Sequence, residues 1–444
     1  MISAVRERCA GLDVHRDTVV ACVMWGPAQS EAQWQVQKFG TTVGELEKLR
    51  TWLQEQECRE VVAESTGPYW EPVEHVLEGS CKFRLANPQE VKNRRGHKTD
   101  KKDAWWLAHL FRHDMIRASY LPERPVRELR MLTRRRRELV RGAAQEKNRV
   151  QKLLEQSNIK LRSVLSDVFG ASGAAMLEAL IVNGESDPHR IAALAKGSLV
   201  KKKEQIAAAL EGFHLPQTHR FLIRQTLEHL ASILQQVDEL ETEIGQHMQL
   251  HPEFARSAEL LESIPGFNQV SAAETVAEVG PNVKAFPSAS QLSSWAGVCP
   301  GNHESAGKRA SSRSTKGNPY LRATLNQSAW ASSHQNGSAF QARYRHFSPK
   351  LQHKGAIIAV AHALVYAIHT VLTYQRPYQQ VMATELGEQR AARLIRHHER
   401  RIKHLKTFLR TRSKSDIAFA LSRLEPQESF SEQPRALASR RYIG

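Results

Sequence analysis

The sequence predicts a multidomain protein with an α/β N-terminal domain, a long helical insert and a mostly α-helical C-terminal domain. At 444 residues the chain is too long for one ordinary core, and 41% hydrophobic residues are enough to build two or three cores. Short Val-rich runs dominate the N-terminal part, whereas Gly and Pro almost vanish between residues 125 and 165. Beyond residue 258, helical patterns return between turns.

The N-terminal domain is predicted over residues 1–122 and begins with strands. Cys9 to Val14 and Thr18 to Met24 are apolar runs that flank three polar residues, which predicts a β-hairpin. Further strands are predicted at 36–39, 60–63 and 83–86, and helices at 41–56, 68–78 and 100–111. This order, in which strands come first and then alternate with helices, is typical of an RNase H-like layered domain.

The helical insert is predicted over residues 123–252. Its first long helix runs from Pro125 to Leu165, and a second runs from Gln217 to Met248 with a stripe of Leu, Val and Ile. The less regular region between them leaves two interpretations open, a coiled-coil hairpin and an ordinary helical bundle. In either case a helical arm could dimerise the protein.

The C-terminal domain is predicted over residues 253–380. The Ile-Pro-Gly-Phe turn around Gly266 resembles a helix-hairpin-helix element, whose backbone N–H groups approach phosphates, although Pro-Gly before a helix is also a common turn. The most membrane-like stretch, Gly355 to Leu372, contains two His and several small residues, which favours a buried core helix. Residues 381–444 are predicted to form a basic helical tail that is partly disordered.

The composition narrows the class of partner. There are 63 Lys and Arg against 46 Asp and Glu, so the net charge is +17, which favours a polyanion such as nucleic acid. The five Cys form no Cys-x-x-Cys pair, which disfavours a zinc ribbon or a disulfide framework. The first residues lack the apolar core of a signal peptide, so we expect a cytoplasmic protein that does not span a membrane.

Four carboxylates are candidates for metal binding. Asp13 lies in the first predicted strand and Glu64 follows another, while Asp100 and Asp103 are three residues apart on one helix face. Mg²⁺ prefers hard oxygen ligands, and two such ions can activate a nucleophile and stabilise a leaving oxygen. Each acid taken alone is more often a cap or a solvated residue, but their order along strands and helix predicts one metal site.

A polar loop between Pro300 and Pro319 interleaves small residues with cations, which suits close approach to a phosphate. A serine that attacks phosphorus keeps the phosphodiester energy in a covalent intermediate, so religation needs no ATP. Composition alone does not choose among the four serines of this loop, Ser305, Ser311, Ser312 and Ser314.

Cations gather around the Asp pair, at the start of the long helix and in the serine loop. We predict that these groups contact nucleic-acid phosphates in a sequence-independent and salt-sensitive way, with a solvated surface as the alternative for each. The predicted contacts are Arg94, Arg95, Lys98, Lys101, Lys102, Arg134, Arg135, Arg136, Arg137, Lys308, Arg309, Arg313 and Lys316, together with Gly266.

Five stretches of the chain resemble the DEDD-type insertion-sequence transposases, which are bridge-RNA-guided serine recombinases. Two are Gly-Leu-Asp-Val-His at Asp13 and Glu-Ser-Thr-Gly-Pro-Tyr-Trp-Glu-Pro-Val from Glu64. The others are Lys-Thr-Asp-Lys-Lys-Asp-Ala, Leu-Leu-Glu-Ser-Ile-Pro-Gly-Phe and Ala-Gly-Val-Cys-Pro-Gly-Asn-His-Glu-Ser-Ala-Gly. The resemblance covers residues 8 to 375, and this set in this order is highly specific.

The resemblance implies a RuvC-like catalytic domain at residues 1–122 and a transposase domain at residues 253–380. It implies that the four acids named above are catalytic and bind Mg²⁺ or Mn²⁺, and that Ser305 is the nucleophile. The composite site would draw its acids and its serine from different protomers of a homodimer that assembles into a homotetramer. A structured non-coding RNA would pair with donor and target double-stranded DNA, in the bacterial cytoplasm at the nucleoid.

Three functions remain open from the residues. The first is a metal-dependent transposase or site-specific recombinase that exchanges DNA strands through a covalent serine–DNA intermediate, and the resemblance implies that RNA guides it. The alternative is a metal-dependent, structure-specific nuclease, like a Holliday-junction resolvase, without that intermediate. The third is a non-enzymatic architectural protein that binds RNA or DNA. The acid tetrad disfavours the third, and the serine loop disfavours the second.

Overall fold

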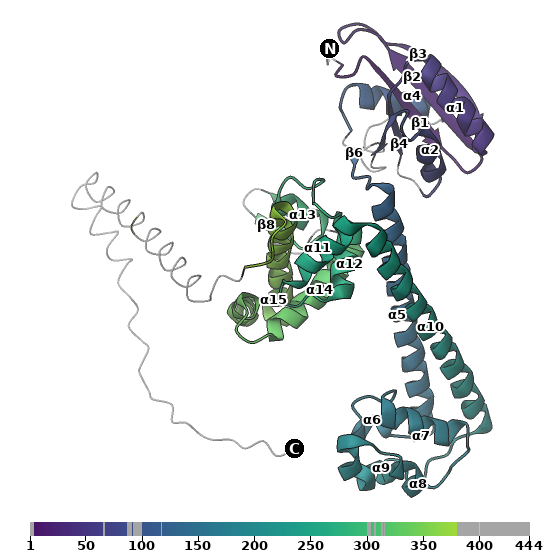
Figure 1. Cartoon of the computed structure of the whole chain (residues 1–444), viewed down its shortest axis with the longest axis vertical. Coiled ribbons are helices and arrows are strands. Elements are labelled where there is room, and N and C mark those ends of the chain that lie inside the picture. Colours follow the sequence, from purple (N-terminus) through teal and green to yellow (C-terminus); the bar gives the residue numbers. More distant parts are fainter. Residues whose placement is uncertain are drawn as a thin grey trace.

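The protein consists of a sheet domain, a helical head and a helical C-terminal domain, which are connected by one long helical arm (Figure 1). The computed structural model describes residues 4–64, 67–86, 91, 100–116, 118–299, 303–305, 308–311, 314, 316–379 and 399. A sheet domain leads into a long two-helix arm that ends in a small helical head, and a helical C-terminal domain packs beside the arm (Figure 1). The predicted tail, apart from residue 399, lies outside the described residues.

The N-terminal domain is built on a mixed six-stranded sheet with the strand order β3-β2-β1-β4-β5-β6. The strands are β1 (Arg8–Val14), β2 (Thr18–Trp25), β3 (Gln33–Gly40), β4 (Glu60–Glu64), β5 (Lys82–Ala86) and β6 (Ala118–Ser119). β1 pairs with β2 antiparallel and with β4 parallel. The predicted hairpin and the α/β class of this domain are therefore confirmed.

Helices cover both faces of this sheet. They are α1 (Val43–Glu55), α2 (Trp70–Leu77) and α4 (Asp100–Arg112). Ala10 and Leu12 of β1 share a core with residues of α1 and α2, whereas the alternate residue Cys9 packs with α4. This alternation follows from the two-residue period of a strand, so neighbouring residues of β1 serve two different cores.

The arm consists of α5 (Arg124–Gln156) and α10 (Gln217–Leu250), which pack along each other through a seam that includes Leu139, Ile233 and Val237. The first helix was predicted to reach Leu165 but ends at Gln156, because the chain turns there with Asn158 in the left-handed region (φ 58°). The head that follows has its own core and contains α6 (Leu161–Val164), α7 (Ala171–Ile181), α8 (Pro188–Ala193), η1 (Gly197–Lys202) and α9 (Lys203–Ala208).

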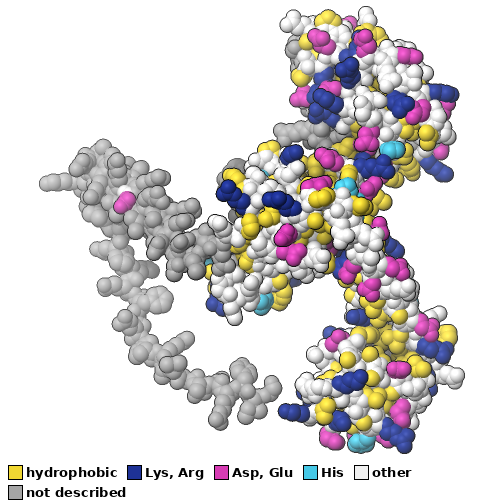
Figure 2. All heavy atoms as spheres, in the orientation of Figure 1, with side chains coloured by type: hydrophobic (Ala, Val, Ile, Leu, Met, Phe, Trp, Pro, Cys, Tyr) yellow, Lys and Arg dark blue, Asp and Glu magenta, His cyan; other side chains and the backbone are white. Residues whose placement is uncertain are grey.

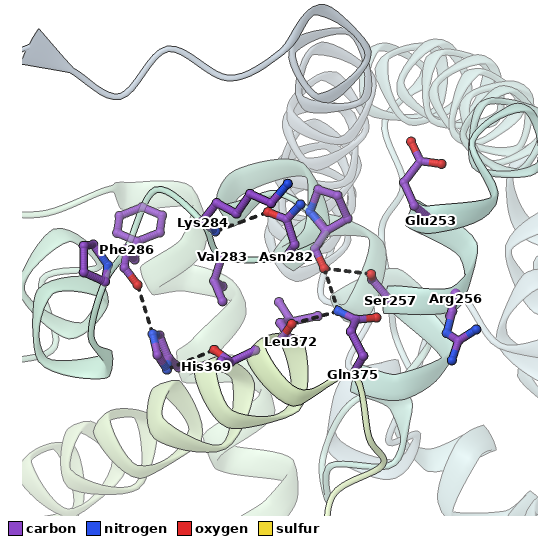
Figure 3. Close-up of a pocket in the computed structure, with 13 residues that line it drawn as sticks. Glu253, Arg256, Ser257, Asn282, Val283, Lys284, Phe286, His369, Leu372 and Gln375 are labelled. Atoms are coloured by element: carbon purple, nitrogen blue, oxygen red, sulfur yellow. Dashed lines mark hydrogen bonds between the residues drawn. The ribbon is translucent and has the colours of Figure 1, made fainter.

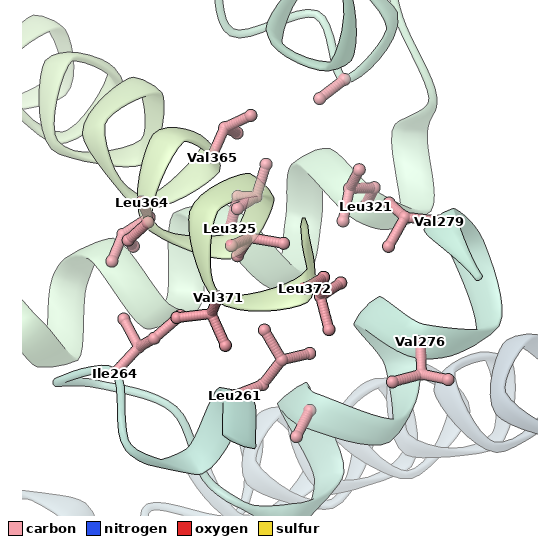
Figure 4. Packing of buried hydrophobic residues seen from close by; sticks show 14 of the residues in the cluster. Leu261, Ile264, Val276, Val279, Leu321, Leu325, Leu364, Val365, Val371 and Leu372 are labelled. Carbon is pink, nitrogen blue, oxygen red and sulfur yellow. The ribbon is translucent and has the colours of Figure 1, made fainter. Parts of the chain in front are cut away.

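In its described residues the C-terminal domain is mostly helical, as predicted, whereas the stretch predicted to be a polar loop contains a small hairpin. Its elements are α11 (Pro252–Glu262), α12 (Gln269–Val279), α13 (Ala289–Trp295), β7 (His303–Ser305), β8 (Lys308–Ser311), α14 (Pro319–His334) and α15 (Ala339–Tyr374). Four of these helices pack around one core, to which they contribute Leu261, Val276, Leu325 and Leu364 among other residues (Figure 4). α15 is long and apolar enough to cross a membrane, but 56% of its most apolar window is buried. Its apolar face is part of this core.

α15 contains a kink at Gln352, whose backbone lies at φ 58° and ψ 173°. This region is populated almost only by Gly and costs other residues about 1–3 kcal/mol. We expect Gln352→Gly to stabilise the protein by about 1 kcal/mol because the relieved strain exceeds the added entropy of the unfolded chain. Urea unfolding measures the change.

A matched control is Gln235→Gly on the exposed face of α10, where the backbone is helical. There glycine is expected to destabilise the helix by about 0.5–1 kcal/mol. Destabilisation of equal size at both positions would show that Gln352 is not strained.

Candidate functional site

Two of the predicted acids lie at the carboxyl ends of neighbouring strands, Asp13 one residue before the end of β1 and Glu64 at the end of β4. Leu12 of β1 lies opposite Ala63 of β4, and Asp13 and Glu64 are the next residues of these parallel strands. Gly11 and Val62 are paired in the same register, and Val62 packs against α4. Because side chains alternate along a strand, Asp13 and Glu64 leave the sheet on its α4 face.

α4 brings the other two acids to the same edge. It runs antiparallel to β1, since the Cys9 thiol contacts the Ala108 carbonyl oxygen (3.6 Å) and the Arg112 guanidinium donates to the Glu7 carbonyl oxygen (2.9 Å). The helix therefore begins beside the end of β1 that carries Asp13. Asp103 lies in its first turn with an exposed side chain, whereas for Asp100 only the backbone is described.

A histidine that sequence reasoning missed stands next to Asp13. His15 Nε2 lies 3.1 Å from the Asp13 carboxylate, and the His15 side chain is about half exposed. The sequence signal that could have revealed this contact is the spacing of Asp13 and His15, because residues two apart along an extended chain have their side chains on one face. Both groups have further interactions, and so do Glu64 and Asp103.

The donor atoms at this edge suit a hard cation because they are carboxylate oxygens. Among the residues that the structure describes, no three Asp, Glu, His or Cys side chains are grouped closely enough to hold a metal ion. Burial raises the pKa of Cys9, Cys22 and Cys58 to about 12, so these thiols stay protonated at neutral pH and are poor ligands. A complete coordination shell here would need Asp100, water or substrate phosphate.

Ser305 lies at the closed end of the hairpin of β7 and β8, opposite Lys308. Farther out along the chain, the backbone of Gly317 approaches that of Gly297 closely, because a Cβ on Gly317 would come within 2.2 Å of the Gly297 amide nitrogen. The structure describes the backbone of Ser305 and Ser311 but not their side chains. The Ser314 hydroxyl accepts a hydrogen bond from Arg322 (2.8 Å). The hairpin and the sheet edge belong to different bodies of the molecule (Figure 1).

The predicted arginine run at the start of α5 mostly faces other parts of the protein. Arg134 donates two hydrogen bonds to Glu278 (2.8 and 2.9 Å), Arg136 pairs with Glu241, and Arg137 pairs with Glu274. Only Arg135 has a largely exposed side chain (57%). Contact of this run with nucleic acid stays a prediction, and three of the four residues have a competing structural role.

Gly266 also has a structural role in the turn between α11 and α12. Its φ is +87°, and an added Cβ would lie 2.4 Å from the Ser328 carbonyl oxygen of α14. The turn is followed by a capping box between Asn268 and Ser271, which starts α12. The two helices and the tight turn were predicted, but the close neighbour of Gly266 is a helix of the same domain. A phosphate contact at Gly266 stays a prediction.

The other predicted basic contacts are less fully described. Lys102 and Lys316 are exposed, and only the backbone is described for Lys101, Lys308 and Arg309. Arg94, Arg95, Lys98 and Arg313 lie outside the described residues, as does Ser312.

The C-terminal domain also has a pocket whose lining includes none of the predicted site residues (Figure 3). His369 Nε2 lies 3.0 Å from the Phe286 carbonyl oxygen, and the Ser257 hydroxyl donates to the Pro281 carbonyl oxygen (2.8 Å). These side chains therefore satisfy backbone groups of the pocket wall. His369 Nδ1 also lies 3.5 Å from the Thr373 hydroxyl, which is longer than an ordinary hydrogen bond of a hydroxyl group. This pair is therefore a weaker candidate for catalysis than the carboxylates at the sheet edge.

The sequence is similar to those of known transposases and of one DNA-inverting protein. Residues 10–159 match the family model of DEDD transposases of the IS110 type. Residues 258–345 match the model described as transposase of the IS116/IS110/IS902 family. The chain is also 22% identical over 388 residues to a pilin gene-inverting protein of Moraxella bovis, across 83% of this chain and 97% of that protein. The first match contains Asp13, Glu64, Asp100 and Asp103, and the second contains Ser305.

Proposed function

We propose that this chain, which carries two transposase domains of the IS110 type, is an RNA-guided insertion-sequence transposase that exchanges DNA strands through a covalent serine intermediate. The observation that carries the proposal is the meeting of Asp13, Glu64 and the start of α4 at one edge of the sheet. This arrangement supports an RNase H-like, RuvC-like domain. The inverting protein with which the chain aligns along most of its length supports DNA rearrangement as the outcome.

At the sheet edge, the four carboxylates would hold Mg²⁺ or Mn²⁺, which supplies charge stabilisation at the scissile phosphate when bound. The sheet fixes Asp13 and Glu64, and the contact of α4 with β1 fixes the helix that carries Asp100 and Asp103. His15 orients the Asp13 carboxylate through their 3.1 Å contact. Such positioning keeps the ligands in place without reorganisation during the reaction.

At the hairpin, the Ser305 hydroxyl would attack phosphorus. An Oγ–P bond forms, the P–O bond to the leaving deoxyribose breaks, and the proton of the hydroxyl ends on the leaving oxygen. The phosphodiester energy is kept, so the reverse attack by a deoxyribose hydroxyl of another strand reseals the DNA. The backbone of Ser305 lies opposite Lys308, whose charge favours an approaching phosphate.

The separation of the two parts supports a site shared between protomers. The carboxylates lie in the sheet domain and Ser305 in the C-terminal domain, with the arm between them along the chain (Figure 1). A homodimer that assembles into a homotetramer, with contacts through the arm, would bring one protomer's hairpin to another's sheet edge. A bridge RNA would select donor and target DNA by base pairing, and the complex would act in the bacterial cytoplasm.

An adduct assay tests this function. Full-length protein, co-expressed element RNA, Mg²⁺ and labelled donor and target DNA are mixed and resolved on denaturing gels. We expect wild type to give a slow protein–DNA band, Ser305→Ala to lose it, and Asp13→Asn to lower its rate by at least about 100-fold. Ser314→Ala is the matched control in the same loop and is expected to keep the adduct.

The competing function is a structure-specific nuclease that uses the carboxylates alone. It predicts hydrolysed DNA without an adduct in wild type and no effect of Ser305→Ala. That result would reject the serine intermediate while keeping the metal site. If Asp13→Asn were as active as wild type, the metal site would be rejected too.

A further inference from the structure

One stretch of the chain contains no acidic residue. Between Ser305 and Thr384 there is no Asp or Glu, whereas ten Lys or Arg and five His are present. The chain's average of 46 acids in 444 residues would place about eight acids in a stretch of this length. α14 and α15 lie within it, so their cations cannot pair with carboxylates of their own or of the other helix.

The cations of α15 remain available for a partner. Arg345, Lys350 and Lys354 are exposed on or beside the kink. In the described part of the chain, none of the three forms an ion pair with a carboxylate. This differs from the arginine run of α5, where Arg134, Arg136 and Arg137 are each paired with a Glu. Cations without a carboxylate partner, on a stretch of chain without acids, favour a polyanion.

Four aromatic rings from α14 and α15 lie together, and Tyr344 and His353 are sequence neighbours of Arg345 and Lys354. We name these rings the ring cluster: Trp330, His334, Tyr344 and His353. The Trp330 ring centroid lies 4.4 Å from that of His334 and 4.8 Å from that of His353. The Tyr344 hydroxyl lies 2.6 Å from His353 Nδ1. Trp330 is nevertheless 50% exposed, so a flat aromatic surface faces solvent.

The strained kink of α15 positions part of this cluster. Gln352 adopts φ 58° and ψ 173°, and His353 follows it directly, beside Trp330 of α14. Lys350 and Lys354 lie on either side of the kink. Strain of this kind persists where the surrounding structure fixes it and is concentrated at functional sites.

We propose that the ring cluster and its flanking cations bind unpaired nucleotides, with a base stacked on Trp330 and phosphates held by Arg345, Lys350 and Lys354. Every base has a flat face that stacks on an aromatic ring, and a cationic groove follows the backbone, so this chemistry recognises single strands. A duplex keeps its bases stacked inside and would use only the charges. The inference rests on the proposed function in that the partner is nucleic acid, but its residues include neither Ser305 nor the four acids.

The test measures how full-length protein binds fluorescent oligonucleotides of about 12 nucleotides, oligo(dT) and oligo(rU), by anisotropy. We expect Trp330→Ala to weaken binding of at least one of them by about 5- to 100-fold, and Trp330→Phe to restore most of it. Trp34→Ala removes a similarly exposed Trp (56%) from β3 and is expected to leave binding unchanged. The Lys350→Ala/Lys354→Ala pair should lower the salt dependence of binding by about one to two phosphate contacts.

Stronger effects on oligo(rU) would identify RNA as the source of the unpaired nucleotides, and stronger effects on oligo(dT) would identify DNA. Equal binding by Trp330→Ala, Trp34→Ala and wild type would overturn the inference, as would equal loss of affinity for a duplex. Thermal unfolding of Trp330→Ala excludes a folding defect, with Trp330→Phe as the second variant. Loss of single-strand binding with a retained Ser305 adduct separates this surface from the proposed catalytic function.

Discussion

Gly11→Ala is expected to destabilise the N-terminal domain by about 3 kcal/mol and to lower DNA cleavage at the same time. A Cβ on Gly11 would lie 2.4 Å from both the Ala104 carbonyl oxygen and the Ala108 amide nitrogen of α4. Both are backbone atoms, so no side chain can rotate away, and the helix itself must move. Overpacking of this kind costs about 1–3 kcal/mol, or more where the backbone has to shift.

The functional part of this prediction follows from the position of α4. To restore ordinary contacts, α4 must move by about 1 Å from β1, and it carries Asp103 and Asp100 at its start. Displacement of a catalytic group by about 1 Å can lower a rate by about 100-fold. Gly11 therefore couples the packing of the sheet to the geometry of the four acids.

Urea unfolding and the adduct assay measure the two effects on the same preparations. Gly245→Ala in α10 is the matched control, because nothing lies within 4 Å of the added Cβ. Replacing that helical glycine is expected to stabilise the arm by about 0.5–1 kcal/mol and to leave cleavage unchanged. Wild-type stability and cleavage in Gly11→Ala would contradict the close contact between β1 and α4.

The sequence predicted the positions of Asp13 and Glu64 on their strands better than it predicted the elements around them. Asp13 and Glu64 could be placed because apolar runs mark where strands end, and parallel neighbours bring those ends to one edge. The approach of α4 to β1 was not foreseen, although Gly11 within an apolar strand is the residue that permits it. A pattern along the chain shows which face a helix buries but not which element covers that face.

The arginine run of α5 shows the same limit for charge. Arg134 lies 144 residues from Glu278, and local charge patterns carry no information about such partners. The run therefore resembles a phosphate-binding surface in sequence. In the structure, Arg134 and Arg137 instead connect α5 to Glu residues of α12 in the C-terminal domain. Conversely, the acid-free stretch of α14 and α15 has no long run of cations, and only the absence of carboxylates reveals it.

Glu278→Ala is expected to destabilise the C-terminal domain by about 3–5 kcal/mol. The Glu278 carboxylate is 3% exposed, accepts two hydrogen bonds from Arg134, and lies 3.5 Å from Arg130. It also accepts from the side chain of Asn318, whose Oδ1 caps α14. Removing one partner of a buried pair leaves the other charge uncompensated, which costs more than the pair itself contributes.

The double variant Arg134→Met/Glu278→Leu distinguishes that cost from the contribution of the pair, and it is expected to recover most of the lost stability, as measured by urea unfolding. Arg135→Ala is the matched control in the same run, because its pairing with Glu138 is long (3.6 Å) and exposed, and it should change stability by less than about 0.5 kcal/mol.

The affinity of the same variants for DNA then separates the structural role of the run from nucleic-acid binding. If Arg135→Ala weakens binding while folded Arg134→Met/Glu278→Leu does not, Arg135 contacts phosphate and Arg134 joins the arm to the C-terminal domain. An equal loss in both folded variants would instead assign Arg134 to the nucleic-acid surface, against the role that its contacts with Glu278 indicate.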